Sequence, residues 1–555
     1  MCKLTVIIPV YNESEYIAFA IESVLNQRTS FPFVLLIVDD ASDDDTPHII
    51  EQYREYIEQE KRTTGCVQII NIRQKRNRGK GYCMYRAYNE MKRYQQGGYF
   101  LILDGDDFFT IRDKLQRQVV FLEENPQYFG CGHEYIVARE KERLSLYIAG
   151  EYATHPKYNA ELAQRGFHNI EEYEEIYYYA HTSTMMYRNM FSDIDVPAYF
   201  GRPSMRGDSA LLLWYFIMTQ QRVGHMNMLG SCYNIHGKGI WSGIKVEEKK
   251  DLIHKMMRQL TSLTSSTRYK EGLHGLENLF IRAIVQEEES VSNPETIYQL
   301  IYGITQSILE MIIQEKQTNI LYLSQTLDTM LENIGKVYAV KQGIRKYGTQ
   351  YKKERVGILC SESDEEEYTR IICNHIDVLV NSGKEVYVFY VSQGRGDNKS
   401  SSKCKEFCTQ RGIPFFLYTG EQEESGLYSD IIERRLCYYL EAIYAQRLSE
   451  LHCYILPFDI IASCCMQEGI AECIILHTSD VGSLAQGISM SVVDAIYVDS
   501  VGLAHALCRV DVLSSKSILV QDDTCTGYTL FHEYNSDIEM STLEDEAVEV
   551  VNVIF

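Results

Sequence analysis

The chain has 555 residues, of which 45% are hydrophobic and 24% are charged, with a formal net charge of −23 and 16 cysteines. This length predicts about two to four domains, because a single hydrophobic core stops growing near about 300 residues. The acidic balance argues against broad electrostatic binding to nucleic acid or anionic lipid. The cysteines form no CxxC pair, which predicts reduced thiols in a cytosolic compartment. No apolar stretch is long enough to predict a membrane span.

The first hundred residues alternate between strand and helix patterns. We expect buried strands at residues 4–10, 33–38, 66–72 and 99–103. A helical period follows the first strand, and Asn12 with Glu15 is expected to form a capping box at its start. Another helix is expected at about 82–94. Such alternation predicts a parallel sheet with helices on both faces, hence an α/β fold.

Polar side chains follow each of the four strands. They are Tyr11 and Asn12, then Asp39 and Asp40, then Asn77 to Lys80, and finally Asp104, Asp106 and Asp107. Ligands bind at the carboxyl ends of strands in open parallel sheets, so we expect these side chains to share one rim.

The last of these clusters, in "FLILDGDD", places two aspartates one residue apart at a strand end. Both can reach one divalent ion, and hard oxygen ligands suit Mg²⁺ or Mn²⁺ together with phosphate oxygens. The alternative is a solvated acidic turn. The position of Asp104 and Asp106 on the shared rim favours the metal.

The rest of the chain predicts a helical middle region and a second α/β domain. After a helix near 113–124, "HTSTMMYR" (181–188) resembles a strand and residues 207–220 a buried helix. Residues 246–350 are expected to be helical and to end in a linker. Later strands are expected at 355–360, 385–391, 413–418, 453–458, 473–478 and 495–500. The predicted domains are 1–245, 246–350 and 351–555, the last a doubly wound domain of unknown role.

Over about residues 1–245 the sequence resembles the inverting family-two glycosyltransferases of GT-A fold. The motifs that carry the resemblance are "VIIPVYNESEYIAFAIESVLNQ", "LLIVDDASDDDT", "NRGKG", "FLILDGDD", "HTSTMMYR", "RGDSALLL" and "YNIHGKGIWS". The resemblance implies a metal-dependent transfer of a sugar from a nucleotide-diphosphate sugar, UDP in the first instance, to a hydroxyl of a glycan or lipid-linked glycan. It also implies a role in surface polysaccharide or glycoconjugate synthesis.

The resemblance also implies roles for individual residues. Pro9, Tyr11 and Glu13 would border the nucleotide, and Asp40 would accept a hydrogen bond from the uracil ring. Asp39 would support the loop, while Asn77, Arg78 and Lys80 would line the nucleotide side. Asp104 would contact the ribose or the Mn²⁺ or Mg²⁺ ion, Asp106 would bind that ion, and His236 would meet the ion or the diphosphate. Asp208 would be the general base, for which the plain alternative is a helix N-cap.

The chain departs from the family pattern in two places. Gly207 stands where many members have a second acidic residue beside the base, and no QxxRW motif is present. We therefore expect a transferase that adds one sugar, or a few, per encounter. His133, His155, His168 and His181 show no metal-ligand spacing and are interpreted as core or surface residues.

Three alternatives stay open at this point. A nucleotidyltransferase would show a glycine-rich, lysine-containing loop after the first strand, which is absent from "PVYNESE". A catalytically inactive sugar-nucleotide-binding module in a polysaccharide assembly complex would show the same motifs. A bifunctional chain would carry a second site in 351–555, where "HTSDVGSLAQG" (477–487) could be a donor loop. The expected location is the cytoplasm, including the inner face of the cell membrane, with no nucleic acid partner.

Overall fold

The computed structural model describes residues 2–59, 65–140, 144–148, 181–205, 208–235, 244–286, 320–341, 343, 351–361, 366–392, 399–418, 428–454, 460–478, 492–498, 517–521 and 528–530. The chain forms two compact units, Met1–Ser307 and Ile308–Phe555, and each is described by itself. The finer division expected at residues 245 and 350 remains a prediction.

The N-terminal unit begins with four parallel strands in the order β3-β2-β1-β4. They are β1 (Leu4–Val10), β2 (Phe33–Asp39), β3 (Cys66–Arg73) and β4 (Tyr99–Ile102). Every residue of β1, β2 and β4 is buried, as their continuous apolar runs predict. β3 lies at the sheet edge and is partly exposed. The expected parallel α/β sheet is confirmed.

The sheet continues with antiparallel pairings and becomes mixed. β8 (Met186–Arg188) runs antiparallel to β4, and the order continues through β6 (Tyr128–Glu140), β9 (Arg222–Ile235) and β5 (Phe108–Phe109), with β7 (Leu144–Ile148) beside β6. The strand expected over 181–188 is wrong in its first half, where Thr182–Thr184 forms a 3-10 turn. The His181 side chain accepts the Ser183 N–H there, so local capping replaces strand pairing.

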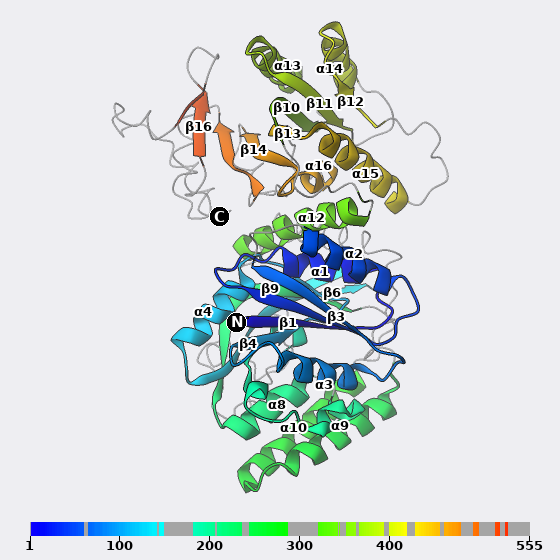
Figure 1. Cartoon of the computed structure of the whole chain (residues 1–555), viewed down its shortest axis with the longest axis vertical. Helices are drawn as coiled ribbons and strands as arrows, with labels where there is room; N and C mark the ends of the chain where they lie inside the picture. The colour runs from blue at the N-terminus through cyan, green and yellow to red at the C-terminus, as the bar shows by residue number, and fades with distance from the viewer. Residues whose placement is uncertain are drawn as a thin grey trace. The chain divides into compact units, whose positions relative to one another are not determined.

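Helices cover both faces of this sheet. Figure 1 shows α1 (Ile17–Leu25) and α2 (Thr46–Gln59) on one face and α3 (Lys80–Met91), α8 (Asp208–Thr219), α9 (Val246–Thr261) and α10 (Thr267–Gln286) on the other. Three further 3-10 turns, Met190–Ser192, Ala198–Gly201 and Pro203–Met205, lead from β8 to α8. The core on the second face is aromatic, with Trp214 stacked on Phe191 at 5.4 Å between ring centroids. Trp214 also donates to the Tyr199 hydroxyl at 2.7 Å, which satisfies its buried N–H.

The capping box expected at α1 is wrong. The helix begins at Ile17 with Tyr16 as its N-cap residue, and no side chain caps it. Asn12 instead has a φ of 53° and exchanges two hydrogen bonds with Asp43, at 2.7 and 2.9 Å. Asparagine tolerates this left-handed conformation, so the residue joins two loops rather than starting a helix.

A buried lysine opens α4 (Lys114–Glu124). The Lys114 side chain is 0% exposed, donates to Gln118 Oε1 at 2.7 Å and lies 4.3 Å from the centre of the Phe109 ring. Burial lowers the pKa of Lys114 to about 7, partly opposed by Cys131. The folded pKa is therefore below the unfolded value, so the buried ammonium destabilises the fold fully below pH 7 and not at all above about pH 10.5.

We expect Lys114→Met to stabilise the N-terminal unit by about 2 to 4 kcal/mol at pH 7, after allowing for the lost Gln118 hydrogen bond. The gain should shrink steadily toward pH 10, because the lysine becomes neutral in the unfolded chain as well. Urea unfolding followed by tryptophan fluorescence measures this, since Trp214 and Trp241 are the chain's two tryptophans. Lys255→Met, at a 56% exposed side chain, is the control. A gain independent of pH would contradict the assignment.

The second unit has its own sheet in the order β12-β11-β10-β13-β14-β15-β16-β17, parallel except for the last pair. The strands are β10 (Lys352–Ser361), β11 (Glu385–Val391), β12 (Phe415–Phe416), β13 (Leu448–Tyr454), β14 (Ala471–Thr478), β15 (Ala495–Val498), β16 (Ser517–Gln521) and β17 (Tyr528–Leu530). The helices are α12 (Ile320–Lys341), α13 (Glu366–Asn381), α14 (Lys399–Gln410), α15 (Tyr428–Gln446) and α16 (Ile460–Cys465). The second α/β domain is thus confirmed.

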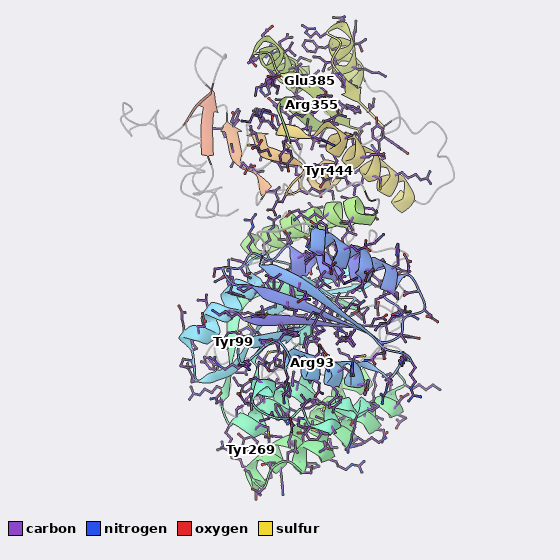
Figure 2. All side chains as sticks on the ribbon, viewed as in Figure 1. Arg93, Tyr99, Tyr269, Arg355, Glu385 and Tyr444 are labelled. Carbon is purple, nitrogen blue, oxygen red and sulfur yellow. The ribbon has the colours of Figure 1, made fainter. Side chains whose placement is uncertain are left out.

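Two strands of this sheet differ from the sequence prediction. The strand expected at 413–418 is limited to Phe415–Phe416. The strand expected at 453–458 ends at Tyr454 and begins earlier, at Leu448. The polar residues of β13 interrupt the apolar pattern by which a strand is predicted. In the fold they have partners; Ser449, for example, donates to Lys353 O and Arg355 O, both at 3.0 Å. Arg355, labelled in Figure 2 with Glu385, pairs with that glutamate at 2.9 Å across the β10–β11 register. Among the described helices, none combines the length and apolar character that crossing a membrane requires.

Candidate functional site

Four loops leave the carboxyl ends of β1, β2, β3 and β4 and lie next to one another. The β1 and β2 loops are joined by backbone donors: Asn12 N–H to Ser42 Oγ at 2.9 Å and Glu13 N–H to Thr46 Oγ1 at 2.9 Å. Ser14 N–H completes the join by donating to Asp44 Oδ2 at 3.0 Å. The predicted shared rim is therefore formed, and its first two loops are held rigidly together.

Asp40 joins the β2 loop to the β3 loop. Its carboxylate accepts the Arg78 N–H at 2.9 and 3.0 Å and the Gly79 N–H at 2.6 Å. A carboxylate offers about four acceptor positions, so capacity remains for another donor. Asp39 is buried beside it, accepts the Ser42 N–H at 2.9 Å and pairs with Arg73 at 3.2 Å. Asp39 thus supports the loop, as expected.

We expect Asp40→Ala to lower the free energy of unfolding of the N-terminal unit by about 1 to 3 kcal/mol, because two backbone donors lose a charged acceptor. Tryptophan-monitored urea unfolding measures the loss, and Asp45→Ala, at an exposed residue of the same loop, is the control. Equal stability of the two variants would show that the Asp40 hydrogen bonds do not hold the β3 loop.

The β3 and β4 loops are joined by an ion pair. Lys80 Nζ lies 2.7 Å from Asp104 Oδ2, and both side chains are largely buried. Arg78 stacks over the Tyr82 ring, with its guanidinium carbon 3.5 Å from the ring centre. Gly79 has a φ of 82°, which favours glycine, and it directly precedes α3. Asn77 Oδ1 accepts the Gly79 N–H at 3.2 Å. The structure therefore places Asn77, Arg78 and Lys80 around one turn.

Four carboxyl groups lie close together at this place, those of Glu13, Asp104, Asp106 and Asp107. Asp104 is the one that pairs with Lys80. Burial, together with the negative charges of Asp106 and Asp104, raises the pKa of Glu13 to about 9. Gly105 lies against the β1 end, where a Cβ would come within 3.0 Å of Val10 Cγ2 and 3.6 Å of Glu13 Cγ. A side chain at 105 would push the two loops apart, so the glycine brings the acidic residues close.

Asp107 is the buried member of this group. Burial raises the pKa of its carboxyl well above the ordinary value, and Asp106 and Asp104 add to the shift. Asp107 Oδ1 accepts the Asn234 N–H at 3.0 Å, and Oδ2 lies 3.7 Å from His181 Nε2. His181 in turn stacks against Tyr233 at 4.1 Å. The sequence left the role of Asp107 open and treated His181 as structural, because their proximity arises only when the 3-10 turn that follows His181 packs against β4 and β9.

The donor set fits a hard divalent cation. Burial raises the pKa values of Glu13 and Asp107, and the negative charges of Asp106 and Asp104 add to both shifts. Asp104 and Asp106 lie at the turn and are half-buried. Mg²⁺ and Mn²⁺ are commonly held by one or two carboxylates together with substrate phosphates, which suits an open carboxylate pair. A cation here would also relieve the repulsion.

The structure describes the remaining predicted residues only in part. Pro9 is buried within β1, where it pairs with Val38, and Tyr11 is 36% exposed at the strand end. Asp208 is the first residue of α8, and its side chain lies outside what the structure describes. His236 lies outside the described residues, as does most of the segment 477–487. Their proposed roles therefore remain predictions.

A parallel sheet whose strand ends carry joined polar loops and an acidic turn defines an α/β domain with polar residues at the edge where such sheets bind ligands. Residues 5–195 match the model of glycosyl transferase family 2, so this part of the chain is a glycosyl transferase family 2 domain. The resemblance inferred from the motifs, and the class of enzyme it implies, are confirmed for these residues.

Curated relatives match part of the chain. An uncharacterized protein of Mycobacterium tuberculosis is 26% identical over 244 residues, which cover 43% of this chain and 61% of the relative. TuaG of Bacillus subtilis, a glycosyltransferase named for teichuronic acid biosynthesis, is 31% identical over 146 residues, covering 26% of this chain and 52% of TuaG. The chain thus spans less than two thirds of the length of these relatives.

Among solved structures, TarS 1-349 of S. aureus in complex with UDP is 16% identical, with a TM-score of 0.36. The aligned region covers 63% of this chain and 93% of the TarS chain.

Proposed function

We propose that the chain transfers a sugar from a UDP-sugar to a hydroxyl of a glycan acceptor, with a divalent cation and with inversion at the anomeric carbon. The observation that supports this most strongly is the excess of negative charge around Glu13, Asp104 and Asp106 at the strand ends of a family 2 domain. A divalent cation with a nucleoside diphosphate would balance that charge.

The donor's nucleotide would lie along the ends of β1, β2 and β3. Asp40 has acceptor capacity left for the uracil N–H, and its loop is fixed by three hydrogen bonds. Tyr11 offers an exposed ring at the end of β1, and Lys80 and Arg78 supply positive charge toward the phosphates. These residues bind and orient the donor.

Asp106 and Asp104 would hold Mn²⁺ or Mg²⁺, with His236 as a further ligand. Such a cation neutralises the negative charge that develops on the leaving diphosphate. Lys80 sits against Asp104 and would add a second positive charge on the same side. Glu13 lies beside the pair, so binding of the cation would lower the pKa of its carboxyl toward the ordinary value.

Asp208 would take the proton from the acceptor hydroxyl as that oxygen attacks the anomeric carbon. The C–O bond to the diphosphate breaks in the same displacement, so the configuration inverts. One carboxylate suffices for this task when it is held within hydrogen-bond reach of the hydroxyl. The start of α8 places Asp208 at the edge of the aromatic core, after the turns that follow β8.

The acceptor class is proposed from the relative named for teichuronic acid biosynthesis, which points to cell-surface polysaccharide. The second unit would then assist acceptor recognition or assembly. An inactive module that binds the donor without turnover is the alternative from another class. A second transferase site in residues 351–555 is a further alternative.

A thermal-shift screen tests the proposal. UDP-sugars at concentrations far above Kd, with Mn²⁺, should stabilise the folded chain by the free energy RT ln(1 + [L]/Kd). The melting temperature of the intact chain should therefore rise. The shift should appear in tryptophan fluorescence, because both tryptophans precede the predicted boundary at residue 245. The donor that stabilises best should also release UDP when acceptor glycans are added.

Three outcomes separate the proposal from its alternatives. Stabilisation without any UDP release would favour the inactive module. A larger shift with nucleoside triphosphates than with any sugar nucleotide would favour a nucleotidyltransferase. Equal shifts with EDTA and with Mn²⁺ would contradict metal dependence.

A further inference from the structure

Three histidines meet on one face of the second sheet. His452 lies on β13, His477 on the neighbouring β14 and His375 on α13. In the parallel register His452 pairs with Ile475, so His477, two residues further on, points to the same face. The His375 ring lies 4.7 Å from that of His452 and 4.9 Å from that of His477. Helix α13 therefore covers the two strand histidines.

One ring nitrogen of each histidine lies within 4.8 Å of the others, and His452 Nδ1 is 2.8 Å from His477 Nε2. Tetrahedral Zn²⁺ with bonds of about 2.0–2.1 Å needs nitrogens about 3.3 Å apart. Small side-chain rotations would bring the three nitrogens to that spacing. The His452–His477 contact is a single N–H···N hydrogen bond, so these two ring nitrogens already point at each other.

The outer nitrogens are held by partners that favour metal binding. His452 Nε2 lies 3.3 Å from Glu450 Oε2, and Glu450 is itself paired with Lys384 at 3.2 Å. An ionised carboxylate only accepts, so His452 donates from Nε2 and keeps its Nδ1 lone pair toward the cluster. His375 Nδ1 lies 2.8 Å from the Tyr454 hydroxyl, which leaves Nε2 to face the other rings. Carboxylate–histidine–metal arrangements have this form.

The surroundings suit a neutral, ligating imidazole. His452 and His477 are buried and His375 is largely so. Tyr454 stacks on His477 at 4.3 Å and Tyr497 packs edge-on at 4.8 Å, so the rings are confined on further sides.

We propose that His375, His452 and His477 bind a transition-metal ion, Zn²⁺ in the first instance, as three imidazole ligands with a fourth position left for another ligand. Imidazole nitrogens suit zinc, whereas Mg²⁺ and Mn²⁺ prefer oxygen. The site is distinct from the acidic rim of the N-terminal unit in both ligand type and position in the chain. It would tie α13 to β13 and β14.

The test uses the full chain after treatment with a chelator. One equivalent of Co²⁺ should give the visible absorption of a four-coordinate ion, and Zn²⁺ should displace it. Competition with a zinc indicator should give one tight site per chain. X-ray absorption of the wild-type protein with one equivalent of Zn²⁺ should show three imidazole ligands, a readout that needs no variant.

Variants locate the site. His477→Gln and His375→Gln should weaken zinc binding by more than about 100-fold, and Glu450→Gln by about 10–100-fold, since it removes only an outer partner. His274→Gln, at an exposed histidine of α10, is the matched control and should bind as the wild type does. Asp106→Asn should also retain the zinc site, which separates it from the donor site.

Two kinds of result would overturn the proposal: the absence of a site, or a metal bound elsewhere. One is a folded wild-type chain that gives no four-coordinate cobalt spectrum, which would leave the cluster as a hydrogen-bonded histidine network. The other is zinc bound equally by the wild type, His477→Gln and His375→Gln, or fewer than three imidazoles in the wild-type absorption spectrum, which would place the metal elsewhere.

Discussion

Asp106→Asn is expected to reduce sugar transfer by at least about 10³-fold, equivalent to about 4 kcal/mol of transition-state stabilisation. Asp106 lies at the acidic turn after β4, and its charge is the largest electrostatic contribution from a neighbour to the raised pKa values of both Glu13 and Asp107. An amide of the same shape keeps the turn but binds a hard cation poorly. UDP release and product formation, with Mn²⁺ present, measure the loss.

The same substitution has a second readout in EDTA. Removing the Asp106 charge should relieve the repulsion around Glu13, so the chelated variant should melt a few degrees above the chelated wild type. Mn²⁺ with donor should then stabilise the wild type but not the variant. The control is Asp45→Asn, at an exposed aspartate of the β2 loop. If Asp106→Asn keeps near wild-type activity, or EDTA leaves the wild-type rate unchanged, the metal assignment is wrong.

Asp208→Asn is expected to lower kcat by about 10²-fold or more, the usual worth of a positioned general base. The donor's nucleotide should bind almost unchanged, because a base acts on the acceptor and its contribution is realised mainly in the transition state. Product NMR should show inverted anomeric configuration. Ser209→Ala, at the next residue of α8, is the matched control.

A purely structural Asp208 would behave differently. Loss of a helix N-cap costs about 1 kcal/mol of stability without changing kcat in the folded fraction. Lower stability with intact kcat would therefore show that Asp208 caps the helix and is not the general base. Weakened UDP binding with intact kcat would move it to the donor site, and retained configuration in the product would exclude the single displacement.

The sequence by itself determined the strands that build the site. Leu4–Val10 and Phe33–Asp39 are continuous apolar runs, and such runs form central parallel strands because both faces are buried. Since the polar residues follow each run directly, their meeting at one rim required only the parallel order β3-β2-β1-β4. The joining of Asp40 to the β3 loop and of Lys80 to Asp104 follows from that order. Because each polar cluster follows its strand directly, the family motifs are short contiguous stretches of the sequence.

Only the tertiary structure decided the contacts between residues that carry no local pattern. Asn12 was free to cap a helix or to bridge loops, and Asp43 in the next loop settled the choice. Lys114 reads as an ordinary surface residue at a helix start, but its helix packs that position into the core. Strand β13 was displaced in the prediction because its polar residues gain partners from β10, which accepts from Ser449, and from β14, whose His477 contacts His452.

The histidine cluster shows the same division most clearly. His375, His452 and His477 have no metal-ligand spacing, because two lie on adjacent strands and one on a covering helix. Hydrophobic periodicity fixes which face of a strand is buried, so it sets the direction of each histidine. It does not tell which strands become neighbours, and that pairing alone brings the three imidazoles together.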